Sequence, residues 1–205
     1  MNYILNIRDW RKLNEDVESL ESTAAADITP AELKTAVSTV NGLIKRGFTK
    51  IEAIALAGNM SVESRFNTAA SDGKAVGLCQ WQGTRLKALK AFAAAKGKSH
   101  TDFETQLNFI KYEMKDYYLD YINGVPKLLV YINSGTTDKP KYIKTLKEYP
   151  KSQSISRDFK NAVAAGTTVS SLTREICNRV LAPLASSSHI ERRVANALKI
   201  QSAVG

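Results

Sequence analysis

Apolar residues recur at helical spacing along most of the chain, and the first clear case begins at Thr29. Thr29 and Glu32 stand in the positions of a capping box, and Pro30 occupies the first helical position. The apolar residues that follow are spaced four, three and four apart: Leu33, Val37, Val40 and Ile44. This spacing lines one face of a helix with apolar side chains. The sequence therefore predicts a helix that begins at Pro30 and stops at Gly47.

The same pattern predicts a second helix, with the acidic residue Glu63 near its C-terminal end. Its start repeats the capping box with Thr49 and Glu52, and its apolar positions lead up to Glu63. A third capping box, Ser188 and Glu191, precedes the last helical pattern. The further helices that we expect cover about 84–97, 101–117, 155–165, 169–182 and 189–201.

Two stretches in the second half of the chain lack this spacing. Residues 117–131 are rich in Tyr and are interrupted by Gly124 and Pro126, so their pattern supports no assignment. Residues 133–152 are polar and rich in Lys. We expect them to form an exposed connection with at most one short helix.

The helical spacing also stops between residues 67 and 83. Asp72-Gly73 is a strong turn dipeptide, and short segments of extended character flank it. We therefore expect a small β-hairpin or irregular β-lobe here. Together with the helices, this lobe predicts an α+β, predominantly helical fold.

The first 28 residues differ from the rest of the chain. They are charge-rich and amphipathic, and they end in the small-residue run STAAAD at 22–27. We interpret 1–28 as an N-terminal extension or linker and 29–205 as a single domain. No stretch resembles a signal peptide, and no run of about 18 apolar residues predicts a membrane span.

The balance of charges bears on the binding partners. Lys and Arg exceed Asp and Glu by 29 − 20 = 9. This excess favours association with acidic polymers: nucleic acid, anionic lipid surfaces or an anionic cell wall. The charge alone does not choose among these three.

Cysteine and histidine give no sign of a metal site. Cys79 and Cys177 lie far apart and lack both CxxC and zinc-ligand spacing, and His100 and His189 have no partners at ligand spacing. We expect two reduced, buried thiols, no metal and no cofactor.

The residues around Glu63 suggest a site for acid catalysis. A carboxylic acid that donates a proton near neutral pH needs a raised pKa, which burial and a helix C-terminus both favour. Such an acid could protonate a glycosidic oxygen. Trp81 offers an aromatic face for a sugar ring, and Gln80 could bind an N-acetyl group. Each residue also has an ordinary alternative: a surface glutamate, a core tryptophan, and for Asp72 a turn residue.

A family resemblance bears on this choice. The stretch 47–92 resembles the phage tail lysozyme family in ten positions: Gly58, Asn59, Glu63, Ser64, Asp72, Gly73, Gly77, Gln80, Trp81 and Arg85. The segment TQLNFIKYEM at 105–114 is similar to a downstream helix of the same family. The block is also similar to the motifs of lytic transglycosylases, with Cys79 where Met is usual.

The resemblance covers about 30–200 and implies a lysozyme-like fold. It implies that the substrate is the glycan strand of peptidoglycan and that Glu63 is the general acid that cleaves the β-1,4 bond between N-acetylmuramic acid and N-acetylglucosamine. The substrate-binding candidates are Ser64, Gln80 and Trp81. Asp72 is the only nearby candidate in sequence for a second catalytic carboxylate.

The chain departs from the family pattern at two places. Leu181-Ala182-Pro183 stands where Glu-Arg-Pro is frequent before the last helix. Arg65 stands where a small residue is common after Glu-Ser. A tight pair between Arg65 and Glu63 would argue against the acid role, because a neighbouring cation favours the charged form of a carboxyl group.

The outcome of the cleavage stays open at this level. Inverting hydrolysis needs a second carboxylate about 6.5–9.5 Å away, and retaining hydrolysis needs one about 5–5.5 Å away. A lytic transglycosylase needs neither and leaves a 1,6-anhydro end. All three outcomes begin with Glu63 as the acid.

Two non-enzymatic readings compete with this one. A basic helical nucleic-acid binder would use the charge excess, but the Lys residues are dispersed and no DNA-binding motif is visible, so no nucleic-acid partner is expected. A virion structural module is the other alternative. For the enzyme, we expect an endolysin in the host cytoplasm with delivery to the periplasm or cell wall, or a virion-associated lysin that docks on virion or tail proteins through 1–28.

Overall fold

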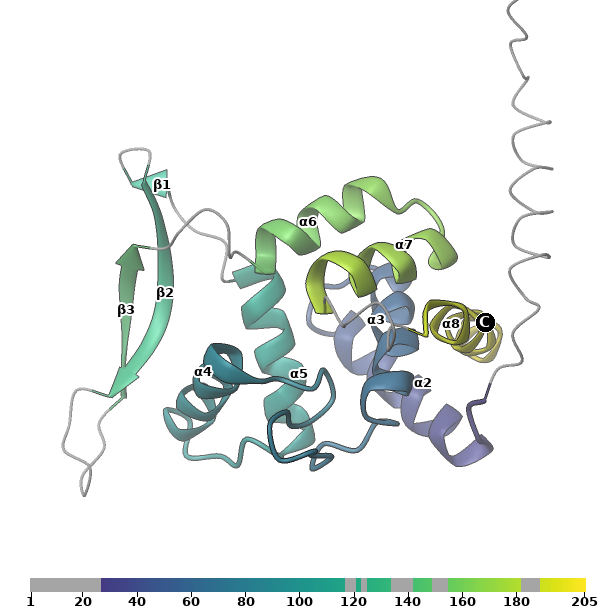
Figure 1. The fold of residues 1–205 in the computed structure, drawn as a ribbon, viewed down its shortest axis with the longest axis horizontal. Helices are drawn as coiled ribbons and strands as arrows, with labels where there is room; N and C mark the ends of the chain where they lie inside the picture. The colour runs from purple at the N-terminus through teal and green to yellow at the C-terminus, as the bar shows by residue number, and fades with distance from the viewer. Residues whose placement is uncertain (1–26, 117–120, 123–124, 134–141, 149–154, 182–188) are drawn as a thin grey trace, which may run out of the picture.

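The computed structural model describes residues 27–116, 121–122, 125–133, 142–148, 155–181 and 189–205 (Figure 1). Helices account for most of these residues, as the sequence predicts. Their bounds are α2 Pro30–Ile44, α3 Lys50–Glu63, α4 Gly83–Ala94, α5 Phe103–Lys111, α6 Ile155–Ala165, α7 Val169–Ile176 and α8 Ile190–Val204. Two π-helical turns continue α5 and α7: η1 Tyr112–Asp116 and η3 Cys177–Leu181. The N-terminal extension, apart from Asp27 and Ile28, lies outside the described residues.

Helix α3 runs through the centre of the molecule, between α2, α7 and α8 (Figure 1). Every residue from Glu52 to Ser61 is buried. A helix that is buried on all sides needs small residues where its neighbours come close, and α3 has Ala53, Ala55, Ala57 and Gly58. The buried position of α3 fixes Glu63, its last residue, against the helices around it.

The two capping boxes predicted at the starts of α2 and α3 are confirmed. In α3 the backbone N–H of Thr49 donates to Glu52 Oε2 at 2.8 Å, and the backbone N–H of Glu52 donates to Thr49 Oγ1 at 3.3 Å. Thr29 and Glu32 repeat both bonds in α2. Each cap stabilises its helix by about 1 kcal/mol. The third predicted box involves Ser188, which lies outside the described residues.

The structure does not confirm a strand hairpin between residues 67 and 83. This segment, which is described throughout, forms turns with two isolated antiparallel bridges, Ser71 to Val76 and Val76 to Trp81. Gly73, Gly77 and Gln80 have positive φ angles, which bend the chain too sharply for two regular strands. The Asp72-Gly73 turn is present, but its flanks form a compact loop.

The described strands lie later in the chain. They are β1 Tyr121–Ile122, β2 Val125–Asn133 and β3 Tyr142–Glu148, which form an antiparallel sheet in the order β1-β2-β3. The expectation of a connection with at most one short helix over 133–152 is thus wrong for β3. Tyr142, Ile143 and Thr145 belong to the residue types that favour strands, and Lys127 of β2 pairs in register with Glu148.

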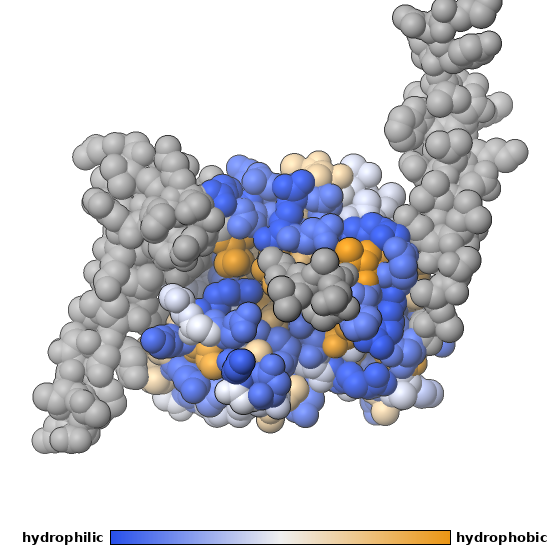
Figure 2. Space-filling view, in the orientation of Figure 1, coloured by the Kyte–Doolittle hydropathy of each residue, from blue (hydrophilic) through white to orange (hydrophobic). Residues whose placement is uncertain are grey.

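The surface of the described part is mostly hydrophilic, with small scattered apolar areas on the face in view (Figure 2). Ile44 and Ile51 are the large hydrophobic side chains most exposed among the described residues, at 38% and 42%. No helix in the described ranges has both the length and the apolar character to cross a membrane.

Candidate active site

Glu63 lies at the C-terminal end of α3 and is paired with an arginine from the last helix. Its Oε1 atom lies 2.9 Å from Nη1 of Arg193 in α8. The Arg193 side chain is 2% exposed, whereas that of Glu63 is 15% exposed. The other carboxylate oxygen, Oε2, has no hydrogen-bond partner among the described residues. Glu63 is therefore held from its inner side and remains accessible from outside.

Gly58 allows α8 to come close enough for this pair. A Cβ atom on Gly58 would lie 2.5 Å from Cβ of Ala197 and 2.9 Å from the backbone oxygen of Arg193. Both distances are shorter than a van der Waals contact, so any larger residue would push α8 away. The close packing of α8 on α3 thus explains why the Gly-Asn motif has a glycine at this position.

Asn59 connects α3 to both neighbouring helices. Its Nδ2 donates to the backbone oxygens of Ala55 at 2.9 Å and of Thr173 in α7 at 3.1 Å. Its Oδ1 and its backbone oxygen accept from Nη1 of Arg193 at 3.3 and 3.2 Å. Asn59 therefore orients the guanidinium that contacts Glu63.

A second buried amide fastens α8 one turn further along. Nδ2 of Asn196 donates to Ser61 Oγ at 2.9 Å and to Asp27 Oδ1 at 3.0 Å. The backbone N–H of Asp27 donates in return to Asn196 Oδ1 at 3.0 Å. The position of Arg193 is thus fixed by its own bonds to Asn59 and by the bonds of Asn196, one helical turn later.

Arg65 pairs with a different acid. Its Nε lies 2.5 Å from Oε1 of Glu32 and its Nη2 lies 3.0 Å from Oε2 of the same residue. A weaker contact of 3.6 Å joins it to Asp27. The hydrogen bond with Glu32 raises the pKa of the Arg65 guanidinium. The structure thus places Arg65 with Glu32 and gives Glu63 to Arg193.

Asp72 is exposed, and its carboxylate binds its own turn. Oδ1 accepts from the backbone N–H of Lys74 at 2.8 Å and of Ala75 at 2.7 Å. These two bonds, Ala75 first, hold the pKa of Asp72 below its usual value. This geometry is that of a turn residue.

The structure corrects the expectation for Trp81. Its side chain is fully buried, and its ring packs edge-on against Phe109 with centroids 5.6 Å apart. Nε1 donates to Oε2 of Glu113 at 3.1 Å. No ring face is open to a sugar, because the apolar core covers both sides of the indole. Trp81 anchors the 67–81 loop to η1.

Trp81 shares Glu113 with Arg85, the other arginine near this region. Nε of Arg85 lies 2.6 Å from Oε1 of Glu113, and Nη2 lies 2.8 Å from Oε2. Arg85 also donates to the backbone oxygen of Val180 at 3.4 Å, so it joins α4 to both π-helical turns. Burial lowers the pKa of Arg85, but Glu113 and, more weakly, Glu63 raise it, and the net direction is upward.

Ser64 and Gln80 both use their side chains inside the loop. Oγ of Ser64 is buried and donates to the backbone oxygens of Met60 at 3.3 Å and Leu78 at 3.2 Å. Nε2 of Gln80 donates to Gly77 O at 2.9 Å. Ser64 therefore joins the end of α3 to the loop, while Gln80 is the partly exposed member of the pair.

Gln106 is a loop-organising residue that the sequence reasoning missed. Its Oε1 accepts from the backbone N–H of Leu78 at 3.0 Å, and its Nε2 donates to the backbone oxygens of Thr68 and His100, both at 2.8 Å. A Cβ on Gly77 would lie 2.5 Å from that Nε2. The available signal was a glutamine on the apolar face of the 101–117 helix.

Both cysteines are buried, and neither forms a disulfide bond. Burial raises the pKa of the Cys79 thiol, and Glu63 adds to this; the same two causes act on Cys177. Both thiols therefore remain protonated and unreactive. No cluster of His, Cys, Asp or Glu suited to a metal occurs within the described ranges.

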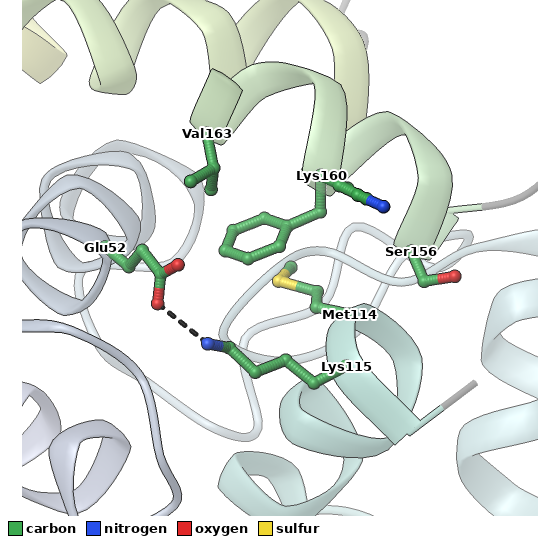
Figure 3. A pocket seen from close by; sticks show the side chains of 7 residues that line it. Glu52, Met114, Lys115, Ser156, Lys160 and Val163 are labelled. Atoms are coloured by element: carbon green, nitrogen blue, oxygen red, sulfur yellow. Dashed lines mark hydrogen bonds and ion pairs between the residues drawn. The ribbon is translucent and has the colours of Figure 1, made fainter. Parts of the chain in front are cut away.

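A pocket of about 280 Å³ lies at the opposite end of α3 (Figure 3). It is lined by Glu52, Met114, Lys115, Ser156, Phe159, Lys160 and Val163. Figure 3 shows the ion pair between two of the lining residues, from Glu52 Oε2 to Lys115 Nζ, at 2.9 Å. Glu52 and Glu63 are eleven residues apart on one helix, about 16 Å by the helical rise, so the pocket is separate from the Glu63 region.

The comparisons with known proteins agree with the geometry. No curated protein matches the chain at a significant level. The family model of the phage tail lysozymes matches residues 34–204, which include Glu63, the 67–81 loop and Arg193. The chain belongs to the phage tail lysozyme family, a membership that indicates a phage peptidoglycan hydrolase.

Proposed function

We propose that the protein cleaves the β-1,4 bond between N-acetylmuramic acid and N-acetylglucosamine, with Glu63 as the general acid. The observation that carries this proposal is the position of Glu63 at the end of a buried helix: its carboxyl group is partly exposed, and Oε2 has no hydrogen-bond partner among the described residues. The pair with Arg193 holds the group in one orientation. By the criterion applied to Arg65, an arginine beside Glu63 counts against the acid role, so the digestion experiment below decides it. A fixed and accessible carboxyl group is what proton transfer to a glycosidic oxygen requires.

Arg193 supports the acid through the charge that develops during the reaction. As Glu63 gives up its proton, its carboxyl group becomes negative, and a guanidinium 2.9 Å away stabilises that charge. Oε1 is the oxygen that pairs with Arg193, and Oε2, which has no hydrogen-bond partner among the described residues, is the oxygen that would face the substrate. Arg193 is a positioning residue, because its own side chain is almost fully buried.

The step after bond cleavage decides between hydrolysis and transglycosylation. Asp72 binds its own turn, and Glu113 is 3% exposed and saturated by Arg85 and Trp81. Neither carboxylate is arranged to activate a water molecule. This favours lytic transglycosylation as the second candidate: Glu63 would take the proton back from the muramyl C6 hydroxyl, which attacks internally and gives a 1,6-anhydro end.

Peptidoglycan digestion by the wild type and by Glu63→Gln tests the acid assignment. We expect the substitution to lower the rate about 10²- to 10⁴-fold, since it removes the transferable proton. Glu191→Gln is the matched control, because Glu191 is also ion-paired with an arginine, Arg174, but is 57% exposed. Equal rates for wild type and Glu63→Gln would reject the acid role. The mass of the muropeptides separates reducing from 1,6-anhydro ends.

The family also bears on where the enzyme acts. A phage tail lysozyme is associated with the virion or acts at the cell wall. We propose that residues 1–28 dock the domain on virion or tail proteins. Loss of virion association on removal of 1–28, with activity on isolated peptidoglycan retained, is the result that this docking role requires.

A further inference from the structure

Positive charge is concentrated on one segment of the chain, α4 and the turns beside it. Residues 73–101 contain no Asp or Glu. They contain six basic residues: Lys74, Arg85, Lys87, Lys90, Lys96 and Lys98. The net charge of the chain is +9, so three unpaired lysines on this segment would account for a third of it. We therefore ask which of the six basic residues have an acidic partner.

Three of the six have acidic or buried partners. Arg85 turns inward to Glu113. Lys74 and Lys98 lie near Asp72 and Asp102, and each lysine contributes to the lowered pKa of its neighbouring carboxyl group, after the hydrogen bonds that dominate the lowering. These three charges are therefore balanced locally.

The other three, Lys87, Lys90 and Lys96, form what we call the α4 lysine face. All three are exposed, and none of them forms an ion pair with any residue that the structure describes. Lys87 and Lys90 are three residues apart and so project from the same side of α4. Lys96 lies over the ring of Phe92, with Nζ 4.9 Å from the ring centroid. The charge of Lys90 also adds to burial in lowering the pKa of His100, which places that turn beside the face.

Arginines elsewhere on the described surface have acidic partners. The pairs are Arg46 with Glu104, Arg65 with Glu32, Arg157 with Asp158, Arg174 with Glu191 and Arg192 with Asp27. Lys34, Lys45 and Lys199 are also exposed and without an ion pair among the described residues, but they are dispersed over α2, its C-cap and α8. The α4 lysine face differs because it gathers three such charges on one segment that contains no Asp or Glu. An uncompensated surface of this kind attracts anionic groups of a partner.

The face begins close to Glu63. Arg85 lies two residues before Lys87 on α4. The loop that leads into α4 is joined to the end of α3 next to Glu63, since Oγ of Ser64 donates to the backbone oxygen of Leu78 at 3.2 Å. Helix α4 extends from this point toward the periphery of the molecule, away from α2 and α8 (Figure 1). A glycan strand bound at Glu63 would therefore carry its substituents past the α4 lysine face.

We propose that the α4 lysine face binds the carboxylate groups of the peptide stems of peptidoglycan. The inference rests on the proposed function, since the stems are attached to the muramyl sugar beside the bond that Glu63 would cleave. Lysine ammonium groups act as mobile point charges and can follow flexible stems of varied conformation. The face thus adds affinity for peptide-bearing strands without taking part in bond cleavage.

The triple variant Lys87→Gln, Lys90→Gln, Lys96→Gln tests the proposal on two substrates. One is peptidoglycan with intact stems, and the other is the same material after an amidase has removed them. We expect KM to rise about tenfold on the first, from three exposed charge pairs, with kcat unchanged and no change on the second. The control triple Lys34→Gln, Lys45→Gln, Lys199→Gln removes three exposed charges from α2, its C-cap and α8, and should leave KM and kcat on both substrates unchanged.

Equal weakening on both substrates, or the same effect from the control triple, would overturn the proposal. Co-sedimentation of the proteins with each substrate in a Glu63→Gln background measures binding without cleavage. This arm separates the two proposals. A Glu63→Gln protein that still cleaves would release muropeptides into the supernatant, whereas a lysine face that does not bind would give equal pelleting of the triple variant and its Glu63→Gln parent. The assignment would also be contradicted if the triple variant bound DNA or a phosphate-rich wall polymer more weakly than its parent but bound peptide-bearing strands equally well. Circular dichroism confirms that each triple variant is folded.

Discussion

Oε1 of Glu63 and Nη1 of Arg193 lie 2.9 Å apart, one at the end of α3 and the other in the first turns of α8. Asn59 binds the same guanidinium nitrogen from α3. The candidate acid is therefore positioned by a residue from the far end of the chain. Because the Arg193 charge is buried, removal of its partner Glu63 would leave it uncompensated and would destabilise the fold.

Replacement of Arg193 should lower kcat with little change in KM. Arg193→Met removes the charge that stabilises ionised Glu63 in the transition state, and we expect kcat to fall about 10²-fold. Arg193→Lys should restore part of that loss. Removal of one partner of a buried pair also costs about 3–5 kcal/mol, so thermal unfolding must be followed in parallel.

The conservative variant separates a positioning role of Arg193 from a purely structural one. Arg193→Lys keeps a cation beside Glu63, so kcat should recover more fully than the melting temperature does. Arg192→Gln, which loses an exposed pair with Asp27, is the control. Equal recovery of kcat and melting temperature would show that Arg193 only holds the fold.

Substitution of Gly58 by Ala should destabilise the protein by about 1–3 kcal/mol, because the new methyl group would overlap Ala197 and the backbone of α8. The second substitution Ala197→Gly should recover part of the loss. Gly42→Ala is the comparison: its nearest atom, at 2.6 Å, is the end of the flexible Leu107 side chain, which can move. Thermal unfolding measures all three, and an equal loss at Gly42 and Gly58 would contradict this explanation.

Trp81→Phe should reduce stability and leave KM unchanged. The variant keeps an aromatic ring in the core but leaves Glu113 without its indole donor, which costs about 1–3 kcal/mol. A sugar-stacking residue would show the opposite result, with a raised KM and an unchanged melting temperature. Urea denaturation and kinetics on the same preparation distinguish the two.

Asp72→Ala should lower the stability of the protein above about pH 4 and leave it unchanged at lower pH. The backbone bonds from Ala75 and Lys74 lower the pKa of Asp72 from its ordinary value of 3.8. The contribution of the carboxylate is therefore fully present above about pH 4 and is lost as the pH falls through the lower, folded-state value. The melting temperatures of wild type and Asp72→Ala should converge in that acid range. Activity should change less than about threefold, whereas a second catalytic carboxylate would give a loss of about 10²-fold or more.

The sequence by itself determined the local features of this protein. The capping boxes at Thr29 and Thr49 and the helices that follow them depend on contacts between residues three or four positions apart. The Asp72-Gly73 turn is equally local, because the Asp72 side chain bonds to the backbone two and three residues ahead. These interactions are encoded in spacing, so pattern alone could find them.

The tertiary structure decided the rest. Whether Arg65 or Arg193 pairs with Glu63 depends on how closely α8 packs on α3, which Gly58 permits and no spacing reveals. Trp81 is a core residue because two residues from a distant segment meet it: Glu113 accepts a hydrogen bond from Nε1, and Phe109 packs against the ring. The loop at 67–83 bends around Gln106 instead of forming two strands. Several local arrangements are compatible with the sequence pattern, and long-range contacts determine which one forms. In this fold they hold the carboxyl group of Glu63 in place and leave it partly exposed.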